Sequence, residues 1–143
     1  MKKVLLTFTL CTGMLACSGG KTQNVTDYPQ TKKDAVEVLY FHGAQRCTTC
    51  MAIEKSTKEL IESSYAEHLK NGKLAFRLVD ITQDAVLADK HEVSWSSLIL
   101  VDYNKNGKES AKNLTEFAFS NVRNAPDKFK AGLSEQITVM LNN

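Results

Sequence analysis

Two of the four cysteines, Cys47 and Cys50, are separated only by Thr48 and Thr49. At the start of a helix this spacing leaves the first sulfur exposed, turns the second one inward, and lets the two close a disulfide without backbone strain. The positive end of the helix and the cation of Arg46 both favour a thiolate on Cys47. The pair therefore predicts thiol–disulfide exchange, in which Cys47 attacks a disulfide and Cys50 resolves the mixed disulfide.

Other uses of the same two cysteines stay open. They could form a purely structural disulfide, or they could bind a metal. A closed zinc site needs four ligands, and the pair together with His42 supplies three. Only soft ions of low coordination number, such as Cu(I) or As(III), suit two thiolates, so we assign no metal-ligand set.

Four further residues are candidate auxiliaries of the pair. His42 precedes it and is either a base or proton relay near the thiols or a histidine of a surface loop. Trp95, Ser96 and Ser97 come from the loop that a resemblance to the thioredoxin-like superfamily places opposite the pair. Trp95 could contact a substrate, but we favour the interpretation that it is anchored in the core.

The N-terminal residues 1–16 have the pattern of an export signal. Lys2 and Lys3 precede an apolar stretch that is too short for the roughly 20 residues of a membrane span. The junction Met14–Ser18 resembles a bacterial lipobox, with Cys17 as the lipid acceptor. The expected processing removes residues 1–16 and anchors the protein through Cys17; an ordinary cleaved leader is the alternative.

The charge of the chain argues against nucleic-acid binding. Its 18 basic and 16 acidic residues give a formal charge of +2, and no basic block occurs. Lys2 and Lys3 account for this excess, so the expected mature chain is neutral. In an exported protein a disulfide can persist, and Cys47 and Cys50 would be the remaining free thiols.

Residues 17–34 read as a lipidated cysteine followed by a polar, flexible tether, and residues 35–143 as one domain. Periodicity and turn residues predict the elements of this domain. They are a strand at 36–41, a long helix from the cysteine pair to about Leu69, a strand at 74–81, a short helix at 84–91, a strand at 97–103, a turn at 104–107, an edge strand at 108–112, a helix around 114–122 and a helix from Pro126.

This order predicts an α/β fold with a mixed sheet. A helix between the first two strands favours a right-handed parallel crossover, and the later turn predicts an antiparallel hairpin.

The chain resembles the thioredoxin-like superfamily over about residues 35–141. The segments YFHGAQRCTTCMAIEK and LTEFAF more narrowly resemble an exported thioredoxin-like family described as a nitrophenyl-compound nitroreductase subunit (ArsF type). The resemblance implies a thioredoxin-like sheet flanked by helices, with the pair at the N-terminus of the long first helix.

The chain departs from the thioredoxin pattern at three points. Arg46 replaces the aromatic residue that usually precedes the first cysteine. The strand and helix that usually come first are missing, so we expect about four strands. The loop that normally carries a cis-proline contains none, so Ser96 or Ser97 takes that position, and we expect a trans peptide there.

The sequence thus predicts a thiol–disulfide oxidoreductase of a bacterial cell envelope, facing the periplasm or the cell surface. It would be tethered to the membrane through Cys17, need no organic cofactor, and exchange electrons with a partner protein. The alternatives are a thiolate-based carrier of a soft metal or metalloid and a non-catalytic subunit of a redox complex.

Overall fold

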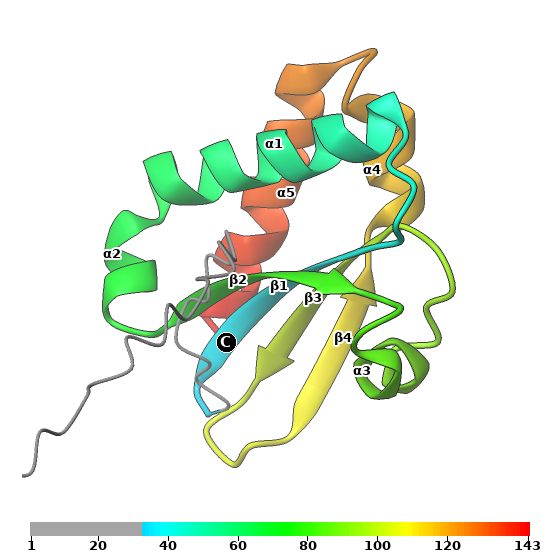
Figure 1. The fold of residues 1–143 in the computed structure, drawn as a ribbon. Coiled ribbons are helices and arrows are strands. Elements are labelled where there is room, and N and C mark those ends of the chain that lie inside the picture. Colours follow the sequence, from blue (N-terminus) through cyan, green and yellow to red (C-terminus); the bar gives the residue numbers. More distant parts are fainter. Residues whose placement is uncertain (1–32) are drawn as a thin grey trace, which may run out of the picture.

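Four strands form one mixed sheet in residues 33–143, the part of the chain that this computed structural model describes (Figure 1). The strands are β1 (Ala35–His42), β2 (Leu74–Asp80), β3 (Ser97–Tyr103) and β4 (Glu109–Asn113), in the spatial order β2-β1-β3-β4. The helices are α1 (Thr48–Ser64), α2 (Ala66–Lys70), α3 (Ala85–Lys90), α4 (Thr115–Asn121) and α5 (Pro126–Leu141). The expected number of strands is confirmed, and the elements follow the expected order except that two helices, α1 and α2, stand where one was expected.

Pairing within the sheet follows from the connections. The helical crossover between β1 and β2 gives a parallel pair, because only a long connection can return the chain to run in the same direction. β1 and β3 pair antiparallel, and β3 and β4 form the expected antiparallel hairpin. At the turn of this hairpin, the side-chain oxygen of Asn104 accepts hydrogen bonds from the amides of Asn106 and Lys108, and Gly107 has a φ of 74°.

β1 lies in the middle of the sheet and is buried on both faces. Val36, Val38 and Tyr40 belong to the apolar cluster under α1, α4 and α5, whereas Leu39 and Phe41 belong to the cluster on the opposite face. Alternate side chains of a strand point to opposite faces, so burial on both sides explains the almost continuous apolar run. The cysteine pair directly follows this rigid central strand.

The two faces of the sheet are covered differently. In Figure 1, α1, α4 and α5 lie over one face, while the short helix α3 lies on the other. The larger cluster includes Ile53 and Ile61 of α1 together with Phe129, Leu133 and Ile137 of α5. The thick helical layer therefore fixes α1, and with it the cysteine pair, against the sheet.

The expectation of one continuous helix to about Leu69 is wrong. The chain departs from helical geometry at Tyr65, where φ is −126° and ψ is 22°, and a second helix follows. The Tyr65 hydroxyl lies 2.9 Å from the carbonyl oxygen of Ser134 and 2.9 Å from the hydroxyl of Thr138. These contacts with α5 hold the side chain at a point where tertiary packing outweighs local helix propensity.

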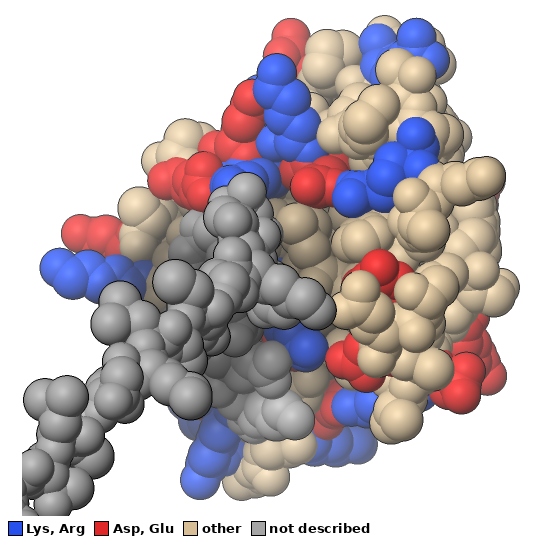
Figure 2. Space-filling model, in the orientation of Figure 1, with Lys and Arg blue, Asp and Glu red and all other residues tan. Residues whose placement is uncertain are grey.

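Charged side chains of both signs are interspersed over the face shown in Figure 2. On α1, Lys55 pairs with Glu59 and Lys58 with Glu62, each at 3.8 Å and four residues apart. Such exposed pairs contribute little to stability. The mixture agrees with the balanced composition and gives this face no strong field of one sign.

The predicted export signal, the lipidated Cys17 and all but the last residues of the predicted tether lie outside the described residues. Within residues 33–143, the helices are too short or too polar to cross a membrane.

Candidate functional site

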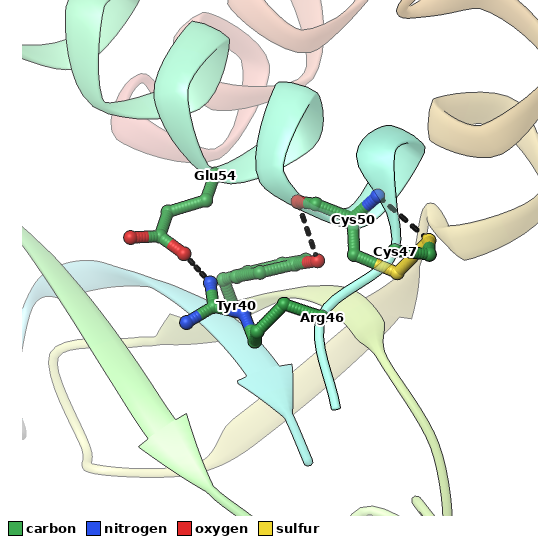
Figure 3. The surroundings of a disulfide bond; sticks show 5 residues. All are labelled: Tyr40, Arg46, Cys47, Cys50 and Glu54. Atoms are coloured by element: carbon green, nitrogen blue, oxygen red, sulfur yellow. Dashed lines mark hydrogen bonds and ion pairs between the residues drawn. A yellow bond between two sulfur atoms is a disulfide. The ribbon is translucent and has the colours of Figure 1, made fainter. Parts of the chain in front are cut away.

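Cys47 and Cys50 form a disulfide at the start of α1, with their Cα atoms 4.9 Å apart (Figure 3). Cys47 is exposed at the N-cap position, whereas Cys50 lies inside the first turn with 7% of its surface exposed. The helix start thus presents one sulfur to solvent and shields the other. This is the arrangement that the two-residue spacing predicts.

The Cys47 sulfur caps the helix. It accepts a hydrogen bond from the backbone amide of Cys50 at 3.0 Å, which satisfies one of the amides that a helix start leaves without a partner. After reduction, a thiolate at this position would receive the same amide and the positive end of the helix dipole. Both interactions favour the charged form of the nucleophile.

The structure changes the expected role of Arg46. Its guanidinium forms an ion pair with Glu54, one helical turn beyond Cys50. Figure 3 shows the Arg46 side chain extending away from the two sulfurs and toward Glu54. The carboxylate offsets the cation, so Arg46 influences Cys47 less than an unpaired neighbour would.

Tyr40 lies directly beneath the cysteine pair and was not recognised from the sequence. Its side chain is fully buried, and its hydroxyl donates a hydrogen bond to the Cys50 carbonyl oxygen at 2.8 Å. Burial raises the pKa of Tyr40, an effect that the Ser96 hydroxyl and the charge of Arg46 partly oppose. The sequence could have pointed to Tyr40, because side chains alternate between the two faces of β1 and this alternation places Tyr40 on the face that α1 covers.

An open cleft surrounds the disulfide. Besides the two cysteines, its lining consists of Gly43, Gln45, Ile81, Ser94, Trp95, Ser96 and Phe119. None of these described lining residues carries a formal charge. Sequence reasoning missed Ile81 and Phe119, because they come from separate segments that only the folded chain brings together, and it also missed Gln45, although this residue precedes Cys47 by two positions.

The interpretation of Trp95 as a core anchor is wrong. Its side chain is 57% exposed, and its ring lies 5.3 Å from that of Phe119, measured between ring centroids. Trp95 thus extends over the surface beside the disulfide, and Phe119 of α4 supports one side of it. The two rings also line a second shallow pocket, whose other lining residues are the polar Asn113, Thr115, Glu116 and Ser120.

The two serines of the loop have different positions. Ser96 is buried and lines the cleft with the disulfide. Ser97 begins β3, and its hydroxyl donates to the Trp95 carbonyl oxygen at 3.0 Å. In the described part of the chain every peptide bond is trans, and of the two serines it is Ser96 that lines the cleft with the cysteines.

His42 is not among the residues that line the cleft. It ends β1, where it pairs in register with Asp80 of β2, and its Nδ1 atom lies 3.2 Å from the carbonyl oxygen of Gly43. Hydrogen bonds from the hydroxyl and the amide of Thr82 lower the pKa of Asp80, and the proximity of His42 and Arg46 acts in the same direction to a smaller extent. The structure therefore associates His42 with the edge of the sheet near Asp80.

Among residues 33–143, no group of three or more histidine, cysteine, aspartate or glutamate side chains is arranged to hold a metal ion. In this part of the chain, the cysteine pair could supply two thiolates to a soft ion such as Cu(I) or As(III).

No family model matches the chain, and no curated protein sequence matches it. Among solved structures, the chain is similar to the Trx4 domain of ERdj5, with a TM-score of 0.53, 15% sequence identity, and coverage of 79% of this chain and 85% of that domain. A structure described as a malarial protein matches with a TM-score of 0.39 and 22% identity, over 60% of this chain and 93% of that one. The four-stranded mixed sheet, the flanking helices and the disulfide at the start of α1 thus agree with the first of these likenesses, and the fold of this chain is thioredoxin-like.

Proposed function

We propose that this protein is a thiol–disulfide oxidoreductase that uses Cys47 and Cys50 as its redox pair. One observation carries the proposal: the exposed Cys47 sulfur caps α1 and accepts the Cys50 amide at 3.0 Å, while Cys50 lies buried behind it. A capped, accessible sulfur is the form in which a thiolate is both stabilised and available for attack.

The reaction follows from this geometry. In the reduced protein, the Cys47 thiolate attacks one sulfur of a substrate disulfide, forms a mixed disulfide, and releases the other substrate sulfur as a thiolate. Cys50 then loses its proton to solvent and attacks the Cys47 sulfur, and the second substrate sulfur leaves with the bonding electron pair. The substrate gains two electrons and the cysteine pair becomes a disulfide. A partner dithiol reverses these steps and restores the reduced form.

The substrate contact proposed here is the surface formed by Trp95 and Phe119. The lining of the disulfide cleft is uncharged, and the exposed Trp95 ring lies beside it. Aromatic side chains of this kind supply large contact areas at binding sites. The surface suits an uncharged segment with apolar side chains, flanking a cysteine of the partner protein.

We further propose that the protein works in a bacterial cell envelope and is anchored by lipid on Cys17. The support is the sequence of residues 1–18, with Lys2 and Lys3, the short apolar stretch and the small residues around Cys17. The resemblance of YFHGAQRCTTCMAIEK to an exported family described as a nitroreductase subunit (ArsF type) fits this location and a redox role within a complex.

Reduction of insulin disulfides by dithiothreitol tests the activity. The wild-type protein should accelerate the reaction, Cys47→Ser should abolish the acceleration, and Cys50→Ser should accumulate a mixed disulfide on Cys47. Ser63→Ala is a matched control, because Ser63 lies on the same helix with its hydroxyl bonded to the Leu60 carbonyl, away from the thiols. Absence of exchange between the wild-type protein and any disulfide substrate would contradict the proposal.

Titration of the reduced protein with Cu(I) or As(III) separates the activity from metal or metalloid carriage. Tight stoichiometric binding combined with poor disulfide exchange would replace the proposed activity by a thiolate-based carrier function. Partner capture that persists when both cysteines are changed to serine would instead favour a non-catalytic subunit.

A further inference from the structure

The Tyr40 hydroxyl joins the central strand to the start of α1 beneath the disulfide. Tyr40 belongs to the central strand β1, and its hydroxyl donates to the carbonyl oxygen of Cys50 in the first turn of α1 at 2.8 Å. The Ser96 hydroxyl, from the loop before β3, partly opposes the rise in the pKa of Tyr40. Figure 3 shows the Tyr40 ring beneath the helix start, with its hydroxyl directed at Cys50.

This hydroxyl acts as a donor rather than as a base. Burial is the largest influence on the pKa of Tyr40 and raises it, so the phenol stays protonated at neutral pH. A protonated phenol cannot accept the proton that Cys50 must lose. What it can do is hold the Cys50 peptide group at a fixed distance from β1.

Such a restraint matters once the disulfide is open. In the disulfide form the S–S bond itself joins Cys50 to Cys47. In the mixed disulfide this bond is absent, and the first turn of α1 has lost its covalent restraint. The rate and equilibrium of the resolving step then depend on how closely the Cys50 sulfur is held to Cys47, that is, on its effective concentration.

We infer that Tyr40 is a positioning residue for Cys50, holding the first turn of α1 against β1 so that the Cys50 sulfur stays directed at Cys47 during the resolving step. The inference rests on the proposed function. In that step the Cys50 thiol releases its proton to solvent, the Cys50–Cys47 bond forms, and the Cys47–substrate bond breaks with its electron pair on the departing sulfur. Tyr40 exchanges neither proton nor electrons, and acts through the geometry of Cys50 alone.

Equilibration of the full chain with reduced and oxidised glutathione measures the effect. After acid quenching and alkylation, mass spectrometry gives the ratio of the internal disulfide to the Cys47–glutathione mixed disulfide, which reports the effective concentration of Cys50. Tyr40→Phe removes the hydroxyl and keeps the ring, and it should lower this ratio about 3- to 10-fold, as expected for loss of one buried hydrogen bond.

Tyr65→Phe is the matched control. Tyr65 is also a buried tyrosine whose hydroxyl is bonded, but to Ser134 and Thr138 of α5 at the far end of α1. This variant should lower the melting temperature and leave the glutathione ratio within twofold of wild type. A general loosening of the fold would shift the ratio in both variants, whereas a positioning role shifts it only in Tyr40→Phe.

Two results would overturn the inference while leaving the proposed function intact. One is a wild-type ratio in Tyr40→Phe, and the other is an equal fall in both variants.

If Tyr40→Phe does not fold, hydrogen exchange on the reduced wild-type protein tests the inference instead. The Glu54 amide, which bonds the Cys50 carbonyl in an α-helix, should then be protected from hydrogen exchange. Exchange of this amide as fast as at a frayed helix end would contradict the restraint by Tyr40. A wild-type pair that does not exchange with glutathione at all would overturn the inference and the proposed function together.

Discussion

The backbone amide of Cys50 donates a hydrogen bond to the sulfur of Cys47 at 3.0 Å, and Cys47, the N-cap of α1, is the more exposed member of the cysteine pair. The contact that caps the helix would therefore also stabilise a thiolate on Cys47 in the reduced protein. The helix start needs an acceptor at its N-cap, and a sulfur in that position is stabilised as an anion by the same donors.

Cys47 in the reduced protein should therefore be an acidic thiol. We expect the rate of iodoacetamide alkylation of Cys50→Ser, in which Cys47 is the reacting thiol of the folded domain, to rise with a midpoint clearly below the free-thiol value of about 8.5. The same measurement in denaturant gives the reference for an unstructured chain. A folded-state midpoint at or above about 8.5 would contradict helix-start stabilisation of the thiolate.

Arg46 should contribute only modestly to this acidity. Because its guanidinium is paired with Glu54, Arg46→Gln in the Cys50→Ser background should raise the alkylation midpoint by less than about one pH unit, whereas an unpaired neighbouring charge shifts a pKa by about one to three units. Glu54→Gln is the companion variant: it frees the cation and should lower the midpoint. A rise above one unit in Arg46→Gln would show that Arg46 acts directly on the sulfur.

Trp95 should affect reaction with protein substrates more than stability. Since its side chain is 57% exposed, we expect Trp95→Ala to lower the free energy of unfolding by less than about 1 kcal/mol. The same variant should slow insulin reduction about fivefold or more and leave exchange with glutathione, which is too small to cover the surface, nearly unchanged. Val139→Ala, an apolar residue of α5 with 54% exposure, serves as the control. Equal losses with insulin and glutathione would assign Trp95 to the thiol chemistry instead.

His91 should make the fold sensitive to mild acid. Burial lowers the pKa of His91, the charge of Lys90 adds to this, and Glu109 and Glu37 partly oppose it. The unfolded chain, with an ordinary histidine pKa of about 6.5, binds the proton more readily than the folded chain. Stability should therefore fall as the pH decreases below about 6.5, until the folded-state pKa is passed.

Urea unfolding at about pH 7.5 and about pH 5 measures this dependence. His91→Gln should lose less stability between the two pH values than the wild-type protein. His68→Gln, at the other end of the molecule on α2, controls for the loss of a histidine as such. The same decrease in wild type and His91→Gln would assign the acid sensitivity to other groups.

The secondary structure was largely predictable because its signals are local. The apolar run of β1, the helical spacing after the cysteine pair and the Asn104–Gly107 turn each predict their element, and the structure confirms them. The single long helix to Leu69 was the error: the helix is interrupted at Tyr65, whose hydroxyl contacts α5, far away in the sequence.

The sequence by itself determined the cysteine pair and its setting. The two-residue spacing of Cys47 and Cys50 after a buried strand is a local property, and it defines a disulfide at a helix start, with one sulfur exposed and one inside.

Only the tertiary structure decided what surrounds the pair. It placed Tyr40 beneath Cys50, paired Arg46 with Glu54, turned Trp95 to the surface beside Phe119, and brought Ser96 rather than His42 into the cleft. The physical reason is that these contacts join segments from β1, α1, the loop before β3 and α4. Which side chains meet there depends on how the sheet and helices pack, and no periodicity within one segment encodes it.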